Sequence, residues 1–576
     1  MSGAGEGGPD NGPPGDGDGE ERADGTSGAP EERRERTLGM RAFAKPRRLR
    51  VALLTMGVLA IVLAITALLR DKGHGDDGSP PATRAAALVP ADALAYLHLS
   101  TDRARTSVER ALELAKRFPS WPGVRDDLIT SLGGAGGPQA ARELEQWVGD
   151  EAALALLDTR GERAGSLILI EVRDRERALR YLERRTGRPV GQTPYRGTVI
   201  RNYRTVQAAF AGRFLALGPF ESVRSAIDLQ SGRGQSLAAS AAYRKAARGL
   251  PAGRVGDAWV STDGARRVLV PAGGVLGAAG QLLDRPGLAG AAAAIGPEGD
   301  GARVTIKSLL GPGAPPQPAA FEPSLLASVP ADAIAMLETT GLDRFAGRLL
   351  GLSGGGPAGF GAAFAGFKSD LERRTGVDLD AQVLPLLRDE AAISIAAALP
   401  VPVLTIVART RDEQGTREAL ARLQLPLARL LQAPGAGQVP GQGSTGDVSA
   451  FRPVRIAGAD AYQLDVQPGF SLVYTVADGK LIASTSALGV KAAREEKDQL
   501  ADTDAFKTAV RNRDGAITSL VFLEFNQLLG LGEQAGLVDD RSFARFRGDL
   551  RKLGAVGAST STEGTTTSAE IFFEIR

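Results

Sequence analysis

The chain has 576 residues, and its 69 Lys and Arg against 67 Asp and Glu leave a formal net charge of +2. This balance excludes the concentrated basic excess typical of nucleic-acid-binding proteins, so we expect no nucleic-acid partner. The chain contains no cysteine and only two histidines, His74 and His98. These counts exclude disulfides, a thiolate nucleophile, cysteine zinc sites and histidine-rich metal sites. We therefore expect no metal and no cofactor.

The first 50 residues are predicted to form a disordered tail, because they are rich in glycine, proline and acid and hold almost nothing apolar to offset chain entropy. Charge is segregated along this tail. Residues 1–32 hold nine acidic groups and one arginine, whereas residues 33–50 hold eight basic groups and one glutamate. The basic end directly precedes an apolar run.

That run, Val51 to Leu69, is 19 residues without a charge. As a helix it would be about 28 Å long, enough to cross a bilayer once. It predicts a single transmembrane helix that acts as an uncleaved signal anchor, because a cleaved signal peptide would need an n-region of 50 residues and a small-residue cleavage site. A buried core helix is the other alternative, and the flanking basic cluster disfavours it.

The basic residues before the run also predict the topology of the chain. The positive-inside rule places residues 1–50 in the cytoplasm and everything after residue 70 outside, so we expect a single-pass protein of the cell membrane. Residues 70–85 are predicted to be a short flexible stalk.

Beyond the stalk the chain repeats itself. ALVPADALAYLHLSTD, from Ala87, returns as ASVPADAIAMLETTGLD from Ala327, and WVGDEAALALL returns as LLRDEAAISIA. Six such blocks match in the same order. This pattern predicts two tandem copies of one domain, 86–311 and 324–576, joined by a Pro-rich linker at 312–323.

The spacing of the matched blocks jumps once, by about 26 residues, and so locates an insertion in the second copy. The insertion falls in residues 423–454, whose proline, glycine and glutamine content predicts a long loop with a short helical start.

Within each copy, short β runs alternate with amphipathic helices, and Asp-Gly and Glu-Gly pairs before Lys480 and Thr565 indicate antiparallel hairpins. Ser100, Thr101 and Asp102 are predicted to cap a helix that follows them. The predicted fold class is therefore α+β, with mainly antiparallel sheets after the transmembrane helix. The strand-like runs of the first copy are Leu94–Leu99, Ala152–Leu157, Leu167–Val172 and Phe214–Leu217.

Two blocks carry a resemblance to a known family. They are the PADA-plus-strand opening, at Pro90 to Leu99 and Pro330 to Leu337, and LERRTGVDLDAQVLPLLRDEAAISIA at 371–396. The chain resembles, over roughly 86 to 576, a family of bacterial, typically actinobacterial, membrane-anchored proteins catalogued as domain of unknown function thirty-three fifty-two. The resemblance implies an anchored extracytoplasmic protein. It implies no activity and no catalytic residues.

The histidines and serines offer no catalytic constellation. Gly351 to Gly355 matches a nucleophile-elbow pattern around Ser353, but the hydrolase order requires a histidine after the serine and both histidines precede it. His98 alternates with Tyr96 on one strand face, which favours a satisfied, half-buried histidine over a catalytic one. His74 lies in the predicted stalk, where nothing orients it.

Acidic residues are the remaining candidates. The doublets Asp150-Glu151 and Asp389-Glu390 recur in both copies, at a predicted helix-to-strand boundary that favours turn and capping roles over catalysis. An acidic run in the tail mimics the start of a calcium loop but lacks its bidentate glutamate at position twelve, so we interpret it as solvated tail; its residues are Asp16, Asp18 and Glu20. Trp121 and Trp147 are interpreted as core or groove aromatics.

Two function classes remain. We expect a non-enzymatic binding or scaffold module of the cell envelope, with a ligand or partner surface between the two copies or under the 423–454 loop. The alternative is a carboxylate-dependent envelope hydrolase, because a glycosidase needs only two acidic residues at the right separation. We expect no catalytic, cofactor-binding or metal residue, and partners limited to the membrane and an envelope ligand or protein.

Overall fold

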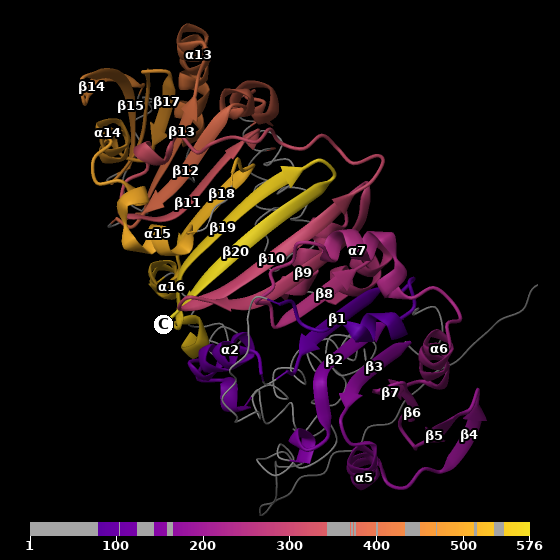
Figure 1. Ribbon diagram of the computed structural model, residues 1–576. Coiled ribbons are helices and arrows are strands. Elements are labelled where there is room, and N and C mark those ends of the chain that lie inside the picture. The colour runs from indigo at the N-terminus through magenta and orange to yellow at the C-terminus, as the bar shows by residue number, and fades with distance from the viewer. Residues whose placement is uncertain are drawn as a thin grey trace, which may run out of the picture. The chain divides into compact units, whose positions relative to one another are not determined.

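In a computed structural model, the part of the chain that the structure describes forms twenty strands, connected by helices and tight turns (Figure 1). The residues that the structure describes are 79–102, 104–123, 143–157, 165–272, 274–342, 369, 372–373, 376–398, 401–431, 450–467, 469–511, 515–534 and 547–576. We call β1–β10 the first half of the fold and β11–β20 the second half.

The strands of the first half are β1 (Ala95–Ser100), β2 (Val148–Leu156), β3 (Ser166–Val172), β4 (Gly191–Tyr195), β5 (Thr198–Asn202), β6 (Gln207–Ala211), β7 (Phe214–Gly218), β8 (Gly256–Val260), β9 (Leu288–Glu298) and β10 (Gly301–Leu310). Those of the second half are β11 (Ala333–Thr340), β12 (Glu390–Ala396), β13 (Val403–Arg409), β14 (Arg452–Ile456), β15 (Ala459–Gln467), β16 (Phe470–Ala477), β17 (Lys480–Ser484), β18 (Ser519–Glu524), β19 (Leu553–Glu563) and β20 (Thr566–Ile575).

All twenty strands belong to one antiparallel sheet. The pairings give the order β4-β5-β6-β7-β3-β2-β1-β8-β9-β10 in the first half. The second half has the same order ten strands later, β14-β15-β16-β17-β13-β12-β11-β18-β19-β20. The two halves join where β10 pairs with β20 along nine residue pairs, from Gly301 opposite Glu574 to Leu309 opposite Thr566.

The predicted fold class is wrong about the arrangement of the sheets. We expected a transmembrane helix followed by two α+β domains with their own sheets, whereas the strands form one continuous 20-stranded sheet. The physical reason lies at β10 and β20: each ends its half as an edge strand, and pairing the two edges satisfies backbone groups that would otherwise be unpaired. No helix among the described residues is long and apolar enough to cross a membrane, and Val51 to Leu69 lies outside the described residues.

Helices cover the sheet in corresponding places in the two halves. The first half has α2 (Thr106–Lys116), α5 (Arg175–Thr186), α6 (Phe220–Gln230), α7 (Ala241–Ala247), α8 (Thr262–Gly264), α9 (Val270–Ala272) and α10 (Gly274–Leu283). The second half has α13 (Glu413–Leu431), α14 (Ala487–Glu495), α15 (Asp504–Ala509) and α16 (Phe525–Gln534). Shorter helical turns are η2 (Arg84–Leu88), η3 (Leu237–Ala239), η4 (Ala265–Leu269), η5 (Leu326–Ser328), η6 (Leu379–Val383), η7 (Leu384–Leu387) and η8 (Leu500–Asp502).

Local sequence explains several of the element ends. Asp174 caps α5 by accepting a hydrogen bond from Arg177 N, and Thr503 caps α15 in the same way from Phe506 N. Gly479 and Gly564 take positive φ values of 69° and 56° in the turns of the β16–β17 and β19–β20 hairpins, which confirms both predicted hairpins.

The predicted cap of the first helix is wrong. Ser100 belongs to β1, and α2 begins at Thr106 after Arg105 with no side-chain cap. Asp102 instead accepts a hydrogen bond from Ala104 N, because a short acidic side chain in a turn bonds its own backbone two residues on.

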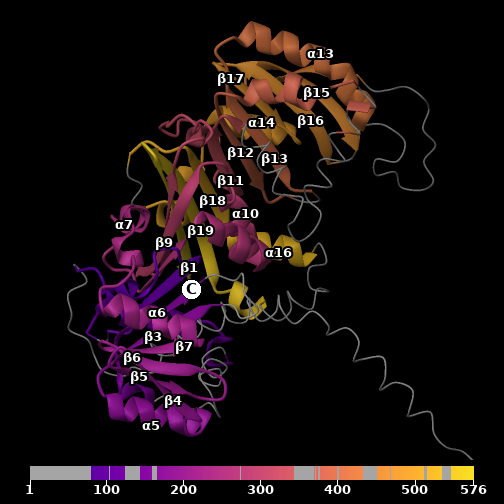
Figure 2. The same ribbon diagram turned by 90° about the vertical axis from the view of Figure 1, so that its right-hand side faces the viewer.

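The predicted insertion begins inside a helix. α13 continues to Leu431, and Leu423 and Ala428 are buried at 4% and 1% exposure. Residues 432–449 lie outside the described residues. α5 and α13 each follow the third strand of their half, β3 and β13. Figure 2 shows α5 near β4 and α13 near β17.

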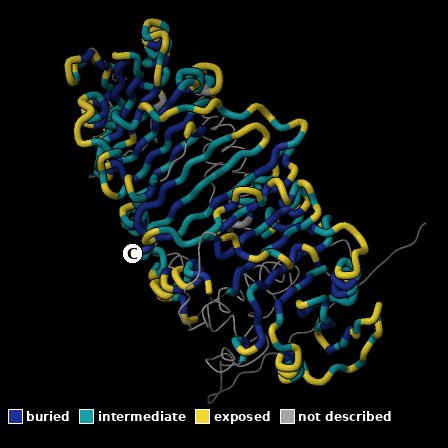
Figure 3. The backbone as a smooth tube through the Cα atoms, in the orientation of Figure 1, coloured by how far each residue is buried: buried dark blue, intermediate teal, exposed yellow. Residues whose placement is uncertain are grey.

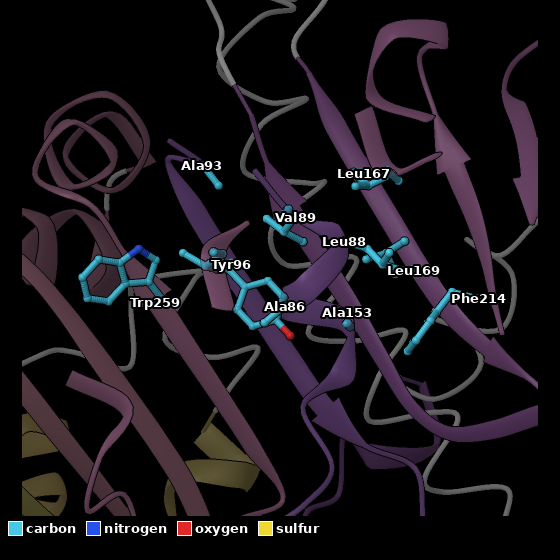
Figure 4. Close-up of a cluster of buried hydrophobic side chains, with 14 of the residues drawn as sticks. Ala86, Leu88, Val89, Ala93, Tyr96, Ala153, Leu167, Leu169, Phe214 and Trp259 are labelled. Carbon is cyan, nitrogen blue, oxygen red and sulfur yellow. The ribbon is translucent and has the colours of Figure 1, made fainter. Parts of the chain in front are cut away.

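The largest core of each half joins sheet residues with helices such as α6 and α14. Figure 3 shows many of the strand residues as buried. In the first half, Tyr96, Leu169, Phe214 and Trp259 pack with the η2 turn in this core (Figure 4). The side chain of Tyr96 lies beside that of His98, with ring centroids 6.5 Å apart. Buried charged residues therefore lie directly beside the core.

Candidate functional site

A row of three ionisable side chains crosses strands β2, β1 and β8. His98 Nε2 lies 3.4 Å from Glu151 Oε2, and His98 Nδ1 lies 3.0 Å from Asp257 Oδ2. His98 and Glu151 are 0% exposed and Asp257 is 5% exposed. The register brings them together, because β1 lies between β2 and β8 and pairs His98 with both Ala153 and Asp257.

This row is arranged to hold a charged histidine. Burial alone would lower the pKa of His98, but the hydrogen bonds and charges of Asp257 and then Glu151 raise it to about 9. Burial alone would likewise raise the pKa of Asp257, but its contacts with His98 and Arg254 hold it below its ordinary value. Arg254 Nε lies 3.1 Å from Asp257 Oδ2. The two carboxylates, Glu151 and Asp257, are thus matched by two cationic groups, His98 and Arg254.

Glu151 also anchors the chain segment that enters the fold. Its two oxygens accept hydrogen bonds from Arg84 N (3.1 Å) and Ala85 N (3.3 Å), the first two residues of η2, and from Arg84 Nε (3.0 Å). Arg84 Nη2 also lies 2.9 Å from Glu171 Oε2. The other oxygen of Glu171, Oε1, lies 2.9 Å from Arg213 Nη1. We call Arg84, His98, Glu151, Glu171 and Asp257 the first carboxylate cluster.

A second carboxylate cluster lies at the matching place in the second half and comprises Ser324, Glu338, Glu390 and Arg409. Glu338 on β11 takes the place of His98, and Glu390 on β12 takes that of Glu151. Glu390 accepts hydrogen bonds from Ser324 N (2.6 Å), Ser324 Oγ and Arg409 Nε (2.9 Å). Leu325 N donates to Glu338 Oε1 at 3.1 Å. Both glutamates therefore hold the chain just before η5.

The two glutamates of this cluster have different proton affinities. Burial raises the pKa of Glu338 to about 8, and its hydrogen bond with Glu390 adds to this. Burial would also raise the pKa of Glu390, but hydrogen bonds from Glu338, Ser324 and Arg409 hold it below its ordinary value. Glu338 Oε2 is buried, and no hydrogen-bond partner among the described residues reaches it. The raised pKa of Glu338 favours its protonated form at neutral pH.

A cavity of about 510 Å³ lies in front of Glu390; we call it the arginine pocket. It is lined by Pro318, Ala319, Thr340, Gly341, Arg388, Asp389, Glu390, Arg409, Thr410, Arg411 and Gly479. Three arginines face two carboxylates in this lining, which leaves a formal excess of one positive charge. Its wall includes the linker, where Ala319 O accepts a hydrogen bond from Thr340 Oγ1 at 2.8 Å.

The structure places the glutamate of each repeated acidic doublet in these clusters. Glu151 accepts hydrogen bonds from the first two residues of η2, and Glu390 accepts them from Ser324, just before η5. Neither glutamate caps the helix end next to it in sequence, which is where we expected the doublets to act. Asp150 and Asp389 lie at the surface, where Asp150 contacts Arg173 at 2.6 Å and Asp389 contacts Arg411 at 3.3 Å.

The other candidates fall into two groups. Trp121 and Trp147 are 9% and 2% exposed, and Trp147 packs on Tyr181 with ring centroids 5.5 Å apart. The remaining candidates lie outside the described residues: Asp16, Asp18, Glu20, His74 and Gly351 to Gly355. Among the described residues, no group of three or more His, Asp or Glu side chains has an arrangement that could hold a metal ion.

Sequence reasoning missed Asp257, Arg84 and Arg409. Asp257 follows glycine at the start of a short apolar strand, GDAWV. An acidic residue in an otherwise apolar strand was the sequence feature that could have indicated a buried site. Nothing in the sequence pairs it with His98, which lies 159 residues away.

A family model described as "Protein of unknown function (DUF3352)" matches residues 51–575. The chain belongs to the DUF3352 family. This confirms the resemblance seen in the PADA and LLRDEAAISIA blocks. No curated protein matches the chain.

Solved structures add a distant likeness. Crystal form III of TP0453 matches with a TM-score of 0.25 and 9% identity, over 42% of this chain and 84% of that chain. Crystal form I matches with a TM-score of 0.25 and 10% identity, over 41% of this chain and 82% of that one. A likeness this low carries no argument about function.

Proposed function

We propose that this DUF3352 protein is a non-enzymatic binding module of the cell envelope. The observation that carries the proposal is the contrast between the two carboxylate clusters. In the first half, Arg84, Glu171 and Arg213 fill the space beside Glu151 with ion pairs. In the second half the matching place is the arginine pocket, open and lined by charged and hydroxyl groups. A fold in which the place beside Glu390 is an open cavity, while the equivalent place beside Glu151 is filled, is suited to ligand binding.

The carboxylates support binding better than hydrolysis. Glu338 and Glu390 have pKa values pushed apart, which is also a feature of acid–base pairs in enzymes. Glycosidase carboxyl groups, however, stand about 5 to 10 Å apart, with the substrate between them. Glu338 and Glu390 hydrogen-bond each other, and Glu338 is 0% exposed. The envelope hydrolase therefore stays the second candidate.

We also propose that the folded part lies on the extracytoplasmic side of the cell membrane. Support comes from the order of charge and apolarity at the N-terminus, where eight basic groups in residues 33–50 precede the uncharged run 51–69. An extracytoplasmic location would present the arginine pocket to envelope components.

The test is a screen of the purified full-length chain against envelope polysaccharides, peptidoglycan fragments, lipids and model esters, with turnover and retention recorded together. We expect retention of an envelope component without turnover. Turnover that is lost in Glu390→Gln, while the variant still folds and binds, would replace the binding module by the hydrolase. Asp150→Asn is the matched control, because Asp150 is a surface carboxylate of the first half.

A further inference from the structure

We propose that the arginine pocket of the second half binds a phosphate group. This inference rests on the proposed binding function and names the chemistry of its ligand. Three arginines line this pocket, and two of them have no arginine at the equivalent position of the first half.

The three arginines converge from two neighbouring strands. β12 and β13 pair with Ala391 opposite Ala408, and both strands end beside the pocket. Arg388 lies two residues before β12, Arg411 lies two residues after β13, and Arg409 is the last residue of β13. Arg388 ends the η7 turn just before β12, and all three arginines line the arginine pocket. Like charges gathered around one cavity repel one another, so this arrangement favours an anion between them.

The contacts of Arg409 and Arg411 with the protein's own carboxylates leave part of each guanidinium group exposed. Arg409 uses Nε and Nη2 on Ser324 Oγ and Glu390, while half of its side chain stays exposed. Arg411 contacts Asp389 through Nε at 3.3 Å and is 88% exposed. Guanidinium groups carry several N–H donors in a planar fork, so these contacts leave donors that a second anion can use.

The first half does not have three arginines at the equivalent positions. By the match of Asp150 with Asp389, Gly149 stands where Arg388 stands in the second half. By strand register, Glu171 stands where Arg409 stands. A Cβ at Gly149 would lie only 2.6 Å from Glu171 Cγ, so the glutamate side chain occupies the space directly beside this position. Of the three arginines only Arg173, the counterpart of Arg411, is kept, and it contacts Asp150. The equivalent place in the first half therefore serves as an internal control, at which we expect no phosphate binding.

Size and charge favour phosphate. A phosphate group carries up to two negative charges and three acceptor oxygens, which matches several arginine forks at once. The cavity of about 510 Å³ holds a group larger than the phosphate itself. The phosphate can therefore belong to free phosphate, to a sugar phosphate or to the headgroup of a lipid.

The experiment is isothermal titration of the full-length chain in a non-ionic detergent with three probes: inorganic phosphate, glucose 1-phosphate and dihexanoyl phosphatidic acid. We expect saturable binding of at least one probe and a loss of affinity of about tenfold or more in the double variant Arg388→Gln/Arg411→Gln. Arg173→Gln, at the counterpart position in the first half, should bind as the wild type does. The probe with the highest affinity identifies the source of the phosphate.

Two results would overturn the proposal: no binding of any probe at about 10 mM, roughly ten times the upper end of typical KM values, or equal binding by the wild type and the double variant. Both substitutions are at exposed arginines, so unchanged circular dichroism and a melting temperature within about 2 °C show that folding is intact. The result also separates the two proposals. Retention of another envelope component without phosphate binding would contradict only the phosphate assignment, whereas hydrolysis of glucose 1-phosphate would contradict only the non-enzymatic function.

Discussion

His98 and Glu338 occupy the same position in the two halves of the sheet, each facing a glutamate on the next strand. His98 lies 3.4 Å from Glu151, and Glu338 hydrogen-bonds Glu390. One pair joins a cation to an anion, and the other joins two carboxyl groups through a proton. In both halves the facing residue, His98 or Glu338, offers a hydrogen-bond donor to the buried glutamate that binds the incoming chain. This donor reduces the free-energy cost of burying the carboxylate.

Replacing Glu338 by glutamine should stabilise the protein at alkaline pH. The folded-state pKa of Glu338, about 8, is raised above its ordinary value of 4.5, so its contribution to stability is fully present below pH 4.5 and is lost as the pH rises through 8. Glutamine keeps the donor to Glu390 and the acceptor for Leu325 N without ionising. Urea unfolding should give Glu338→Gln a gain of about 2–4 kcal/mol at pH 8 and little change at pH 5. Equal effects at both pH values would show that Glu338 does not titrate in this window.

The charged state of His98 should make the protein less stable as the pH rises. Its pKa is raised from 6.5 to about 9, so its contribution is complete below pH 6.5 and disappears as the pH rises through 9. We expect a loss of about 2–3 kcal/mol over this window, measured in the Glu338→Gln background so that Glu338 does not titrate. His98→Gln should be less stable at pH 6 and should remove the slope. A slope that persists in this variant would have to come from another group.

Glu151 and its neighbour Asp150 should differ strongly in their effect on stability. Glu151→Gln leaves Arg84, His98 and two backbone N–H groups facing an amide, and should cost about 3 kcal/mol. Asp150→Asn removes one exposed ion pair with Arg173 and should cost less than about 1 kcal/mol. Chemical denaturation of both variants at pH 7 measures the difference. Comparable losses would mean that the buried cluster is not an anchor.

The topology of the chain is testable with single cysteines, because the chain has none of its own. We expect a membrane-impermeant maleimide to label Ser79→Cys in intact cells and to spare Ser27→Cys, since the basic residues before Val51 favour a cytoplasmic N-terminus. Permeabilised cells provide the control, in which both variants should react. Labelling of Ser27→Cys alone in intact cells would reverse the proposed orientation.

The sequence by itself was sufficient for features that depend on local chemistry or on comparison of its own segments. Asp478-Gly479 and Glu563-Gly564 predict their hairpins because glycine takes the positive φ that the turn requires. The matched PADA and DEAA blocks identify Glu151 and Glu390 as equivalent residues. The alternation along β1 predicted a half-buried His98, whereas the residue is 0% exposed and lies beside two carboxylates.

Only the tertiary structure decided which distant groups meet. Pairing of β10 with β20 merges the two halves into one sheet, and backbone hydrogen bonds between edge strands leave no signature in side-chain patterns. Asp257 reaches His98 because β8 is placed against β1, and the arginine pocket stays open because Arg409 stands where Glu171 closes the first half. The pairings of β10 with β20 and of β1 with β8 join strands more than 100 residues apart, and local propensity carries no information about such register.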